Sequence, residues 1–225
     1  HQNYIASSSE WDYRNSGSEL VLARAGFQFH PRVVVGVEGT VSFTAYDQSV
    51  LNDNTGYSGG VYAEWKPSRF LQVRPRAGYT LYDFRQTSTS IPAVDQNAWY
   101  FDLTVTHDLT ESLSYSLSAG HELRLGIQAD TIEDWYARPR VNWKIMKDLT
   151  FTTYLTYEHG TQSSGGLVGS AAENYDWLGL GLGLSHPITK RLTLALNYRL
   201  TLRYSNYPDR EYTQNLAGLL LTLQM

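Results

Sequence analysis

The segment RLTLALNYRLTLRY, residues 191–204, decides the fold. Every second side chain from Leu192 to Tyr204 is leucine or tyrosine, whereas the side chains between them are mainly arginine, threonine and asparagine. Successive side chains of a β-strand point to opposite faces, so this alternation predicts one long strand with an apolar face and a polar, basic face. A helix would instead scatter the leucines around its circumference.

Segments with the same two faces recur along the chain, separated by links that alternate in length. Short turns are expected at 30–32, 66–69, 107–112, 146–149 and 186–191, and mostly longer loops at 48–56, 86–97, 159–175 and 205–211. This alternation is typical of up-and-down hairpins in an outer membrane, so the short turns are predicted on the periplasmic side. The predicted fold class is all-β, a transmembrane up-and-down antiparallel β-barrel of about 12 strands, 11 of them clear. The expected strands are residues 19–29, 33–47, 57–66, 71–84, 99–106, 113–127, 135–145, 149–158, 178–184, 191–204 and 212–225, with a twelfth within 1–10.

The composition fits one large domain made of strands. The 225 residues are 42% hydrophobic and include 18 glycines, 17 tyrosines and 6 tryptophans, which favour turns and strands over long helices. A net charge of −4 gives no reason to expect nucleic acid as a partner, and the absence of cysteine excludes disulfides and cysteine-based metal sites. The chain starts at His1 without a basic and apolar leader, which predicts a mature chain or a fragment. We therefore expect one barrel domain over 1–225, either whole or the C-terminal part of a longer chain.

Aromatic residues near both ends of the strands indicate which face is turned outward. From Tyr57 to Trp65, and from Trp135 to Trp143, the spacing corresponds to roughly 20 Å along a tilted strand, close to the height of the apolar band of an outer-membrane barrel. Tyrosine and tryptophan favour the interface between membrane and water, although both residues are also common in strands generally. A barrel of about twelve strands is also too wide for a dry core. We therefore predict an apolar face turned to lipid, with these membrane-interface aromatic residues: Phe27, Phe29, Tyr57, Trp65, Trp99, Trp135, Trp143, Phe151, Tyr157 and Tyr204.

At this level the chain resembles bacterial outer-membrane β-barrel proteins of a porin-like family with uncertain substrate, over roughly residues 19–225. The resemblance rests on the hairpin periodicity, the two aromatic bands, the hairpin PITKRLTLALNYRLTLRYSNYPDREYTQN and the last strand LAGLLLTLQM. In that class the last strand is an assembly signal that usually ends in phenylalanine, and Met225 departs from this pattern. The resemblance implies an outer-membrane location, contact with the lipid bilayer and lipopolysaccharide, and recognition of the C-terminal strand by the barrel-assembly machinery.

The polar face of the strands is predicted to line the barrel and is rich in arginine. Many acids lie instead in or near the loops, so the total charge hides a basic interior. A ring of arginines lowers the barrier for anions and raises it for cations. Alternatively, the arginines pair with neighbouring glutamates and brace the wall. The predicted pore-lining residues are Arg24, Glu38, Glu64, Lys66, Arg74, Arg76, Asp102, Glu122, Arg124, Arg138, Arg140, Lys144, Glu158, Arg199 and Arg203.

Motifs for catalysis or cofactor binding are missing from the sequence. There is no Gly-x-Ser-x-Gly, no His-Glu-x-x-His and no phosphate-binding loop, so we expect no cofactor, no metal and no enzyme. His121 and Glu122 are adjacent in one strand and point to opposite faces. His159, beside Glu158 and a serine-rich loop, is the one place where a hydrolase site near the rim is conceivable.

Two strands contain residues that are unusual inside a strand. Pro75 cannot donate to a ladder, which predicts a bulge or a locally unpaired position. The alternating glycines of GLGLGL, residues 179–184, are expected to leave room on the inner wall for a plug or a helix.

These features together favour a porin-like channel with a basic, anion-favouring lumen for passive diffusion of small solutes. The alternative is a non-enzymatic barrel scaffold, or a secretion or export component, that holds a partner or plug segment. An outer-membrane enzyme is the third class. Single-channel conductance separates the first class from the other two.

Overall fold

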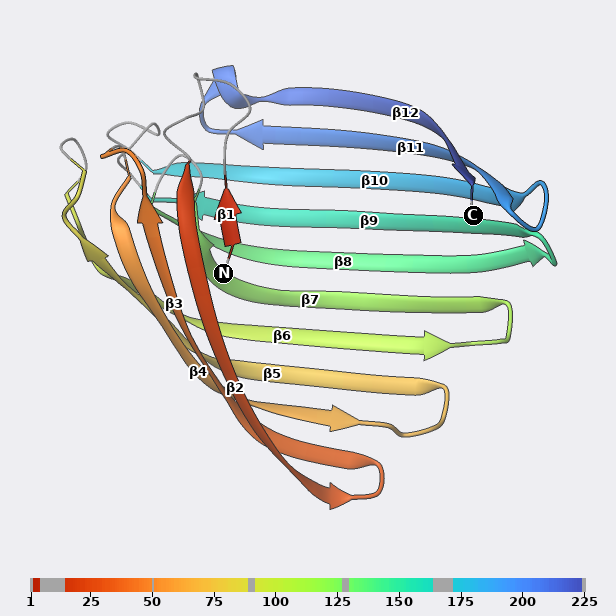
Figure 1. The fold of residues 1–225 in the computed structure, drawn as a ribbon, viewed down its shortest axis with the longest axis horizontal. Helices are drawn as coiled ribbons and strands as arrows, with labels where there is room; N and C mark the ends of the chain where they lie inside the picture. Colours follow the sequence, from red (N-terminus) through yellow and green to blue (C-terminus); the bar gives the residue numbers. More distant parts are fainter. Residues whose placement is uncertain are drawn as a thin grey trace.

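The chain forms one antiparallel sheet of twelve strands in which neighbours in the sequence are neighbours in space (Figure 1). The computed structural model describes residues 2–4, 15–49, 51–88, 92–126, 130–163 and 172–223. The predicted all-β, up-and-down antiparallel class and strand number are confirmed. Within these ranges, no helix is long and apolar enough to cross a membrane. The elements are β1 (Gln2–Tyr4), β2 (Ser16–His30), β3 (Val33–Tyr46), β4 (Asp53–Trp65), β5 (Leu71–Arg85), β6 (Gln96–Asp108), β7 (Leu113–Leu125), β8 (Thr131–Met146), β9 (Leu149–Gln162), β10 (Glu173–Pro187), β11 (Leu192–Ser205), the 3₁₀-helix η2 (Pro208–Arg210) and β12 (Tyr212–Leu223).

The strands extend beyond the predicted segments mainly at their long-loop ends. β4 begins at Asp53 and not at Tyr57, and β10 begins at Glu173 and not at Leu178. These added residues are mostly polar on both faces, so the period of two that marks the rest of each strand is lost there. Ile127 and Met225, which were expected in strands, lie outside the described residues.

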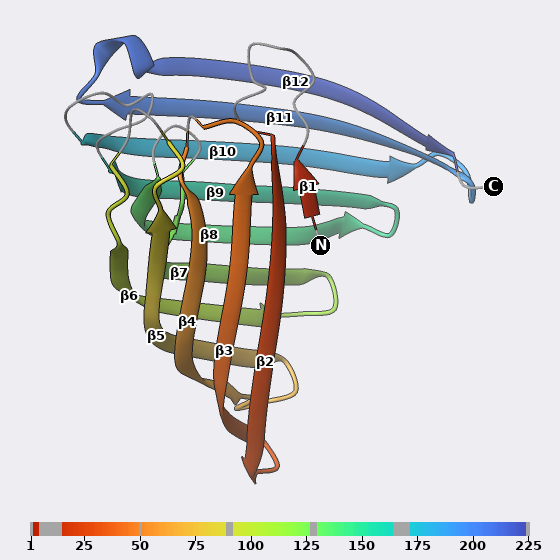
Figure 2. The same cartoon turned by 60° about the vertical axis from the view of Figure 1, so that its left-hand side comes forward.

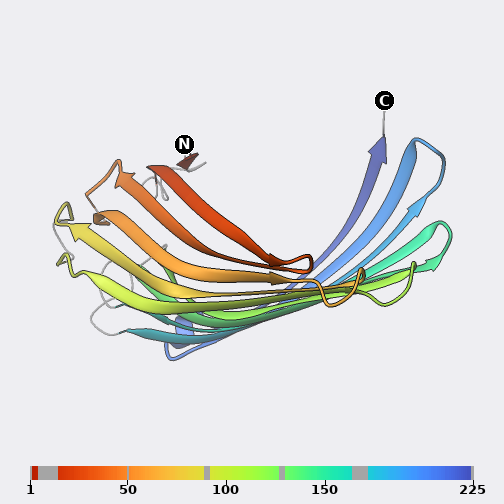
Figure 3. The same ribbon diagram turned by 90° about the horizontal axis from the view of Figure 1, so that it is seen from below.

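The sheet is strongly curved, with the short turns at one end and the long loops at the other (Figures 1 and 2). Seen from below, it is a trough whose two ends, β2 and β12, rise on opposite sides (Figure 3). Side chains of non-adjacent strands can meet only where the sheet is concave. Tyr100 of β6 donates a hydrogen bond to Glu38 of β3 at 3.0 Å, and Tyr136 of β8 donates to Asp102 of β6 at 2.7 Å. The face that carries Glu38 and Asp102 is therefore the concave one.

The convex face is apolar and open. Its large side chains are uncovered, as at Leu196, which is 50% exposed, and Leu219, which is 69% exposed. Such an extent of exposed apolar surface is far beyond what a soluble monomer tolerates. The convex face is the one predicted to contact lipid.

The two edges of the sheet lie at β1 and β12. Among the described residues, β1 covers only Ser16–Ser18 of β2, and β12 pairs with β11 alone. β2 and β12 both run from the long loops to the short turns, whereas β1 runs the other way. β1 therefore has the direction required to pair in antiparallel fashion with both β2 and β12.

Tyrosine rings on the concave face lie across glycines of the neighbouring strands. Tyr100 covers Gly78, and Tyr154 covers Gly181, where a Cβ atom would overlap the ring. The space beside the glycines predicted to accommodate a plug is partly filled by side chains of this chain. Tyr154 occupies the space over Gly181, and Trp177 lies against Gly179. The plug interpretation is corrected at Gly181, where the missing side chain accommodates a ring from the next strand.

Pro75 is unpaired on its β4 side, in line with the predicted locally unpaired position. It pairs with Leu103 of β6 without a shift in register. On its other side the ladder with β4 resumes only at the pair of Trp65 and Val73. Proline has no backbone N–H and cannot donate a hydrogen bond to β4, which explains why the ladder is interrupted at this position.

The long loops are connected to one another at Asn52. This fully buried residue accepts hydrogen bonds from the backbone N–H groups of Thr87 and Ser88 at 3.2 and 2.9 Å, and donates to Asp130 at 3.3 Å. Burial raises the pKa of Asp130, against the hydrogen bond from Asn52, which lowers it. Asn52 thus joins three loops at one end of the trough.

The alternation of turns and loops leads to a test of membrane topology. Because the native chain contains no cysteine, single cysteines at Ser68 and Ser163 can be labelled specifically. Ser68 lies in a short turn and Ser163 follows β9 at the long-loop end. We expect an impermeant thiol reagent added to intact cells to label the Ser163→Cys variant only, and Ser68→Cys to react after permeabilisation. Labelling of both from the same side would contradict the topology.

Candidate functional site

The predicted lining residues share the concave face, and many of them form ion pairs across the strands. At β2 to β6, Arg24 contacts Glu38 at 2.6 Å, and Arg76 lies between Glu38 at 3.7 Å and Asp102 at 3.4 Å. Tyr100 adds its hydroxyl to Glu38. Glu38 is nearly buried while the two arginines are about two-fifths exposed, so the cations face the hollow of the sheet.

A second group continues across β7 to β9. Arg124 contacts Asp134 at 3.4 Å and Glu158 at 3.8 Å, and Arg138 contacts Glu158 at 2.7 Å. Asp134 is fully buried and was missed by the sequence analysis, which placed it with the loop acids. Its even spacing from Tyr136 and Arg138 would have placed it on the lining face.

A third group joins β10, β11 and η2 at the long-loop end. The fully buried Glu173 accepts from Arg203 and Arg210 at 2.7 Å each and from the Ser205 hydroxyl at 2.8 Å. One carboxylate therefore holds two guanidinium groups. Neither Glu173 nor Arg210 was among the predicted lining residues, because both lie in segments assigned to loops.

Five predicted lining cations have no acidic partner in the part of the chain that the structure describes, and all are exposed. Glu64 and Glu122 are lining acids that likewise form no salt bridge there. The alternative that the arginines pair with acids and brace the wall thus applies to the three ion-paired groups and not to these five cations. Most of the five lie toward the short turns. The five are Lys66, Arg74, Arg140, Lys144 and Arg199.

The predicted interface aromatic residues lie on the opposite, convex face. All are exposed except Phe151, which is half-buried. The sequence analysis missed one member of this surface, His121, which is 2% exposed. Its ring lies between those of Trp99 and Trp135, at centroid distances of 4.2 and 4.8 Å. It also contacts the Trp99 carbonyl at 2.9 Å and Glu133 at 3.0 Å, while Glu122 points to the other face as predicted.

His159 and Glu158 do not form a common site. Glu158 points into the concave face and pairs with arginines, whereas the partner of His159 is Asp176 of β10, at 2.9 Å. Tyr157 donates to the same Asp176 oxygen at 2.8 Å. His159 and Asp176 are about half exposed on the convex face, so they do not face the polar hollow.

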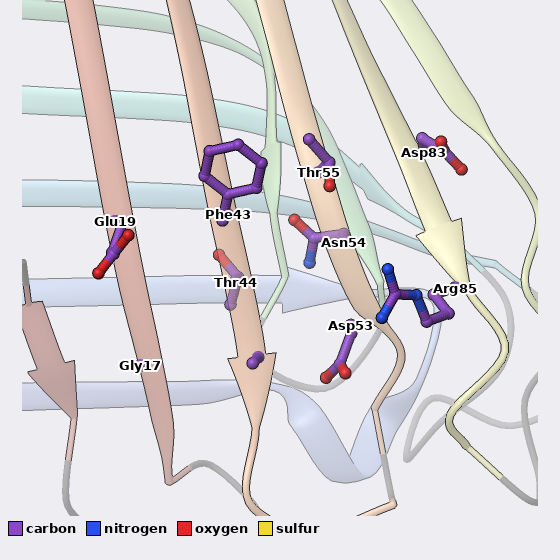
Figure 4. Close-up of a pocket in the computed structure, with 10 residues that line it drawn as sticks. Gly17, Glu19, Phe43, Thr44, Asp53, Asn54, Thr55, Asp83 and Arg85 are labelled. Atoms are coloured by element: carbon purple, nitrogen blue, oxygen red, sulfur yellow. The ribbon is translucent and has the colours of Figure 1, made fainter.

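A cleft of about 400 Å³ lies at the long-loop end of β2 to β5 (Figure 4). Asp53, Asp83 and Arg85 line it together with the ring of Phe43 (Figure 4). Asp53 also accepts a hydrogen bond from the backbone N–H of Tyr46 at 2.9 Å. Asp53 therefore also supports the connection between β3 and β4.

Comparison with known proteins provides a fold likeness only. No protein-family model matches the chain, and no curated protein matches its sequence. Among solved structures it is similar to LpxR from Salmonella typhimurium, at 5% identity and a TM-score of 0.37, over 91% of this chain and 88% of that chain. The prediction that the chain is not an enzyme does not hold, because neither missing catalytic motifs nor up-and-down strands exclude catalysis.

Proposed function

We propose that the chain forms a porin-like channel in the bacterial outer membrane, with an anion-favouring passage along its concave face. The observation that carries this proposal is the group of five exposed cations that have no acidic partner in the described part of the chain. Subtracting Glu64 and Glu122, the two lining acids without a salt bridge, leaves three positive charges among the predicted lining residues that lie outside the ion-paired groups. Arginines held by carboxylates contribute little net field, so these unpaired cations decide the selectivity.

The apolar convex face supports the placement of this passage in a membrane. Lipid is the environment in which exposed leucines and valines are stable, and interfacial aromatic residues belong near the two ends of the strands. The passage is enclosed when the edges at β2 and β12 are joined, and β1 has the strand direction required to join them.

The proposal is tested by the selectivity of the purified protein in a planar bilayer under a potassium chloride gradient. We expect chloride to permeate faster than potassium. Replacing both Arg74 and Arg140 with glutamine removes two unpaired charges from the wall and should move the permeability ratio toward one. The matched control carries Arg69→Gln and Lys147→Gln, which remove the same charge from two short turns.

The control should retain the selectivity of the unaltered protein. Folding of each variant is checked by its β-sheet circular dichroism, so that a lost barrel is not mistaken for lost selectivity. Absence of conductance, or cation selectivity in the unaltered protein, would reject the channel proposal.

A further inference from the structure

A second cleft lies on the concave face at the long-loop end, between β7 and β12. Its volume is about 440 Å³, and it is lined by basic and acidic side chains together with aromatic rings. The residues used in the argument below are Arg124, Gln162, Tyr175, Trp177, Arg203 and Tyr212.

The cationic side of this cleft is held rigidly. Glu173 fixes Arg203 from one side, and the guanidinium of Arg203 lies 4.4 Å from the centre of the Tyr175 ring. Arg124 is held by Asp134 and Glu158 and donates to the Tyr175 hydroxyl at 3.3 Å. A side chain held in this way loses little freedom when a ligand binds, which favours affinity.

Among the residues that the structure describes, two polar atoms at the cleft are buried and have no hydrogen-bond partner. They are Nε of Arg203, a donor, and Oε1 of Gln162, an acceptor; Gln162 is only 6% exposed. Buried polar groups are nearly always paired, since an unpaired one costs about 1–3 kcal/mol. A ligand that completes this site must therefore offer an acceptor to Arg203 and a donor to Gln162.

The third wall is aromatic. Trp177 is partly exposed, and its ring would be 3.0 Å from a Cβ atom at Gly179. Tyr212 is exposed at the edge of the cleft. Aromatic rings with one apolar face and one polar edge suit ligands that are themselves partly apolar and partly hydroxylated.

We propose that this cleft binds a sugar acid, a hydroxylated ring bearing one carboxylate. The carboxylate accepts from Arg203, a hydroxyl donates to Gln162, and the ring lies against Trp177. Glu158, Glu173 and Asp209 balance the three arginines of the cleft, so a singly charged carboxylate fits better than a doubly charged phosphate. The inference rests on the proposed function only in that it names a class of anion for the passage, since binding itself requires no conduction.

Glucuronate is the probe, with glucose and acetate as its neutral and sugar-free counterparts. Isothermal titration calorimetry on the folded, detergent-solubilised protein should show glucuronate binding at least about tenfold more tightly than either control. Gln162→Met keeps the length of the side chain and removes the unpaired oxygen, so the fold is retained while glucuronate affinity falls about tenfold. Gln72→Met, the same change on β5 near the short turns, should leave the affinity unchanged.

Each other outcome overturns the proposal in a recognisable way. Equal binding of acetate shows a simple anion site, and equal binding of glucose shows that Arg203 is not used. No binding of glucuronate, or unaltered binding by Gln162→Met, shows a cleft filled by water alone. These outcomes are separable from failure of the channel proposal, because a protein that binds glucuronate without conducting retains this inference and loses only the other.

Discussion

Leu196→Arg is expected to lower the free energy of unfolding in a membrane by roughly 2–4 kcal/mol, the cost of a cation near the bilayer midplane on the lipid face of a barrel. Leu196 lies near the middle of β11, and its side chain is 50% exposed on the convex face. No carboxylate is available there, because its neighbours in the ladder are Leu184 and Leu219. To bring its charge to the membrane–water interface, the arginine side chain would have to extend across half the height of the apolar band.

The control for this prediction is Asn197→Arg, one residue further along the same strand. Asn197 is exposed on the concave face between Gly183 and Gly218, which leave room for a longer side chain. Its change should therefore cost little. Urea titration of both variants in lipid vesicles, followed by tryptophan fluorescence, gives the two free energies. Equal penalties would mean that the assignment of the faces is reversed.

The sequence was sufficient to predict the faces of the strands because alternation is a local property. The face on which a residue such as Leu196 lies can be assigned from the residues next to it in the sequence, without knowledge of the partner strand. The ion pair of Arg24 and Glu38 was only partly within reach. The short turn after His30 would by itself place Arg24 opposite Gly39, and the β-bulge between Gln28 and His30 shifts it opposite Glu38.

Contacts that depend on the curvature of the sheet could not be predicted in this way. Glu38 is reached by Arg76 and Tyr100 from strands that do not adjoin its own. Likewise, Glu173 is bound by Arg210 from η2, across a loop whose path the sequence does not specify. These contacts show that most central arginines are paired, so the proposed selectivity rests on unpaired cations such as Arg74 and Arg140.

The rings across glycines were missed because a glycine in a strand has no periodic signal of its own. Only the register shows that Gly60 lies beside Gly78 and that the ring of Tyr100 covers both. The sequence therefore indicates space at such glycines but not what fills it. In this fold, a tyrosine of an adjoining strand fills several of these spaces and carries its hydroxyl toward the charged groups.

Gly60→Ala is the substitution by which this arrangement can be tested. A Cβ atom at Gly60 would overlap the Tyr100 hydroxyl and the backbone carbonyl oxygen of Ala77. The carbonyl belongs to the next strand and cannot rotate away as a side chain would. We expect a loss of about 1–3 kcal/mol, the usual cost of overpacking. Displacement of Tyr100 also removes its hydrogen bond to Glu38, which holds Arg24 and Arg76.

Gly59→Ala is the matched control, since it makes the same chemical change one residue away. No atom lies within 4 Å of a Cβ atom at Gly59, so its effect should stay within about 0.5 kcal/mol. Both variants replace a strand glycine by alanine, so the change in freedom of the unfolded chain is the same and cancels in the comparison. Urea midpoints in vesicles measure the difference. If the two variants are equally stable, the ring of Tyr100 does not lie across Gly60, and the charged groups around Glu38 are held by their ion pairs alone.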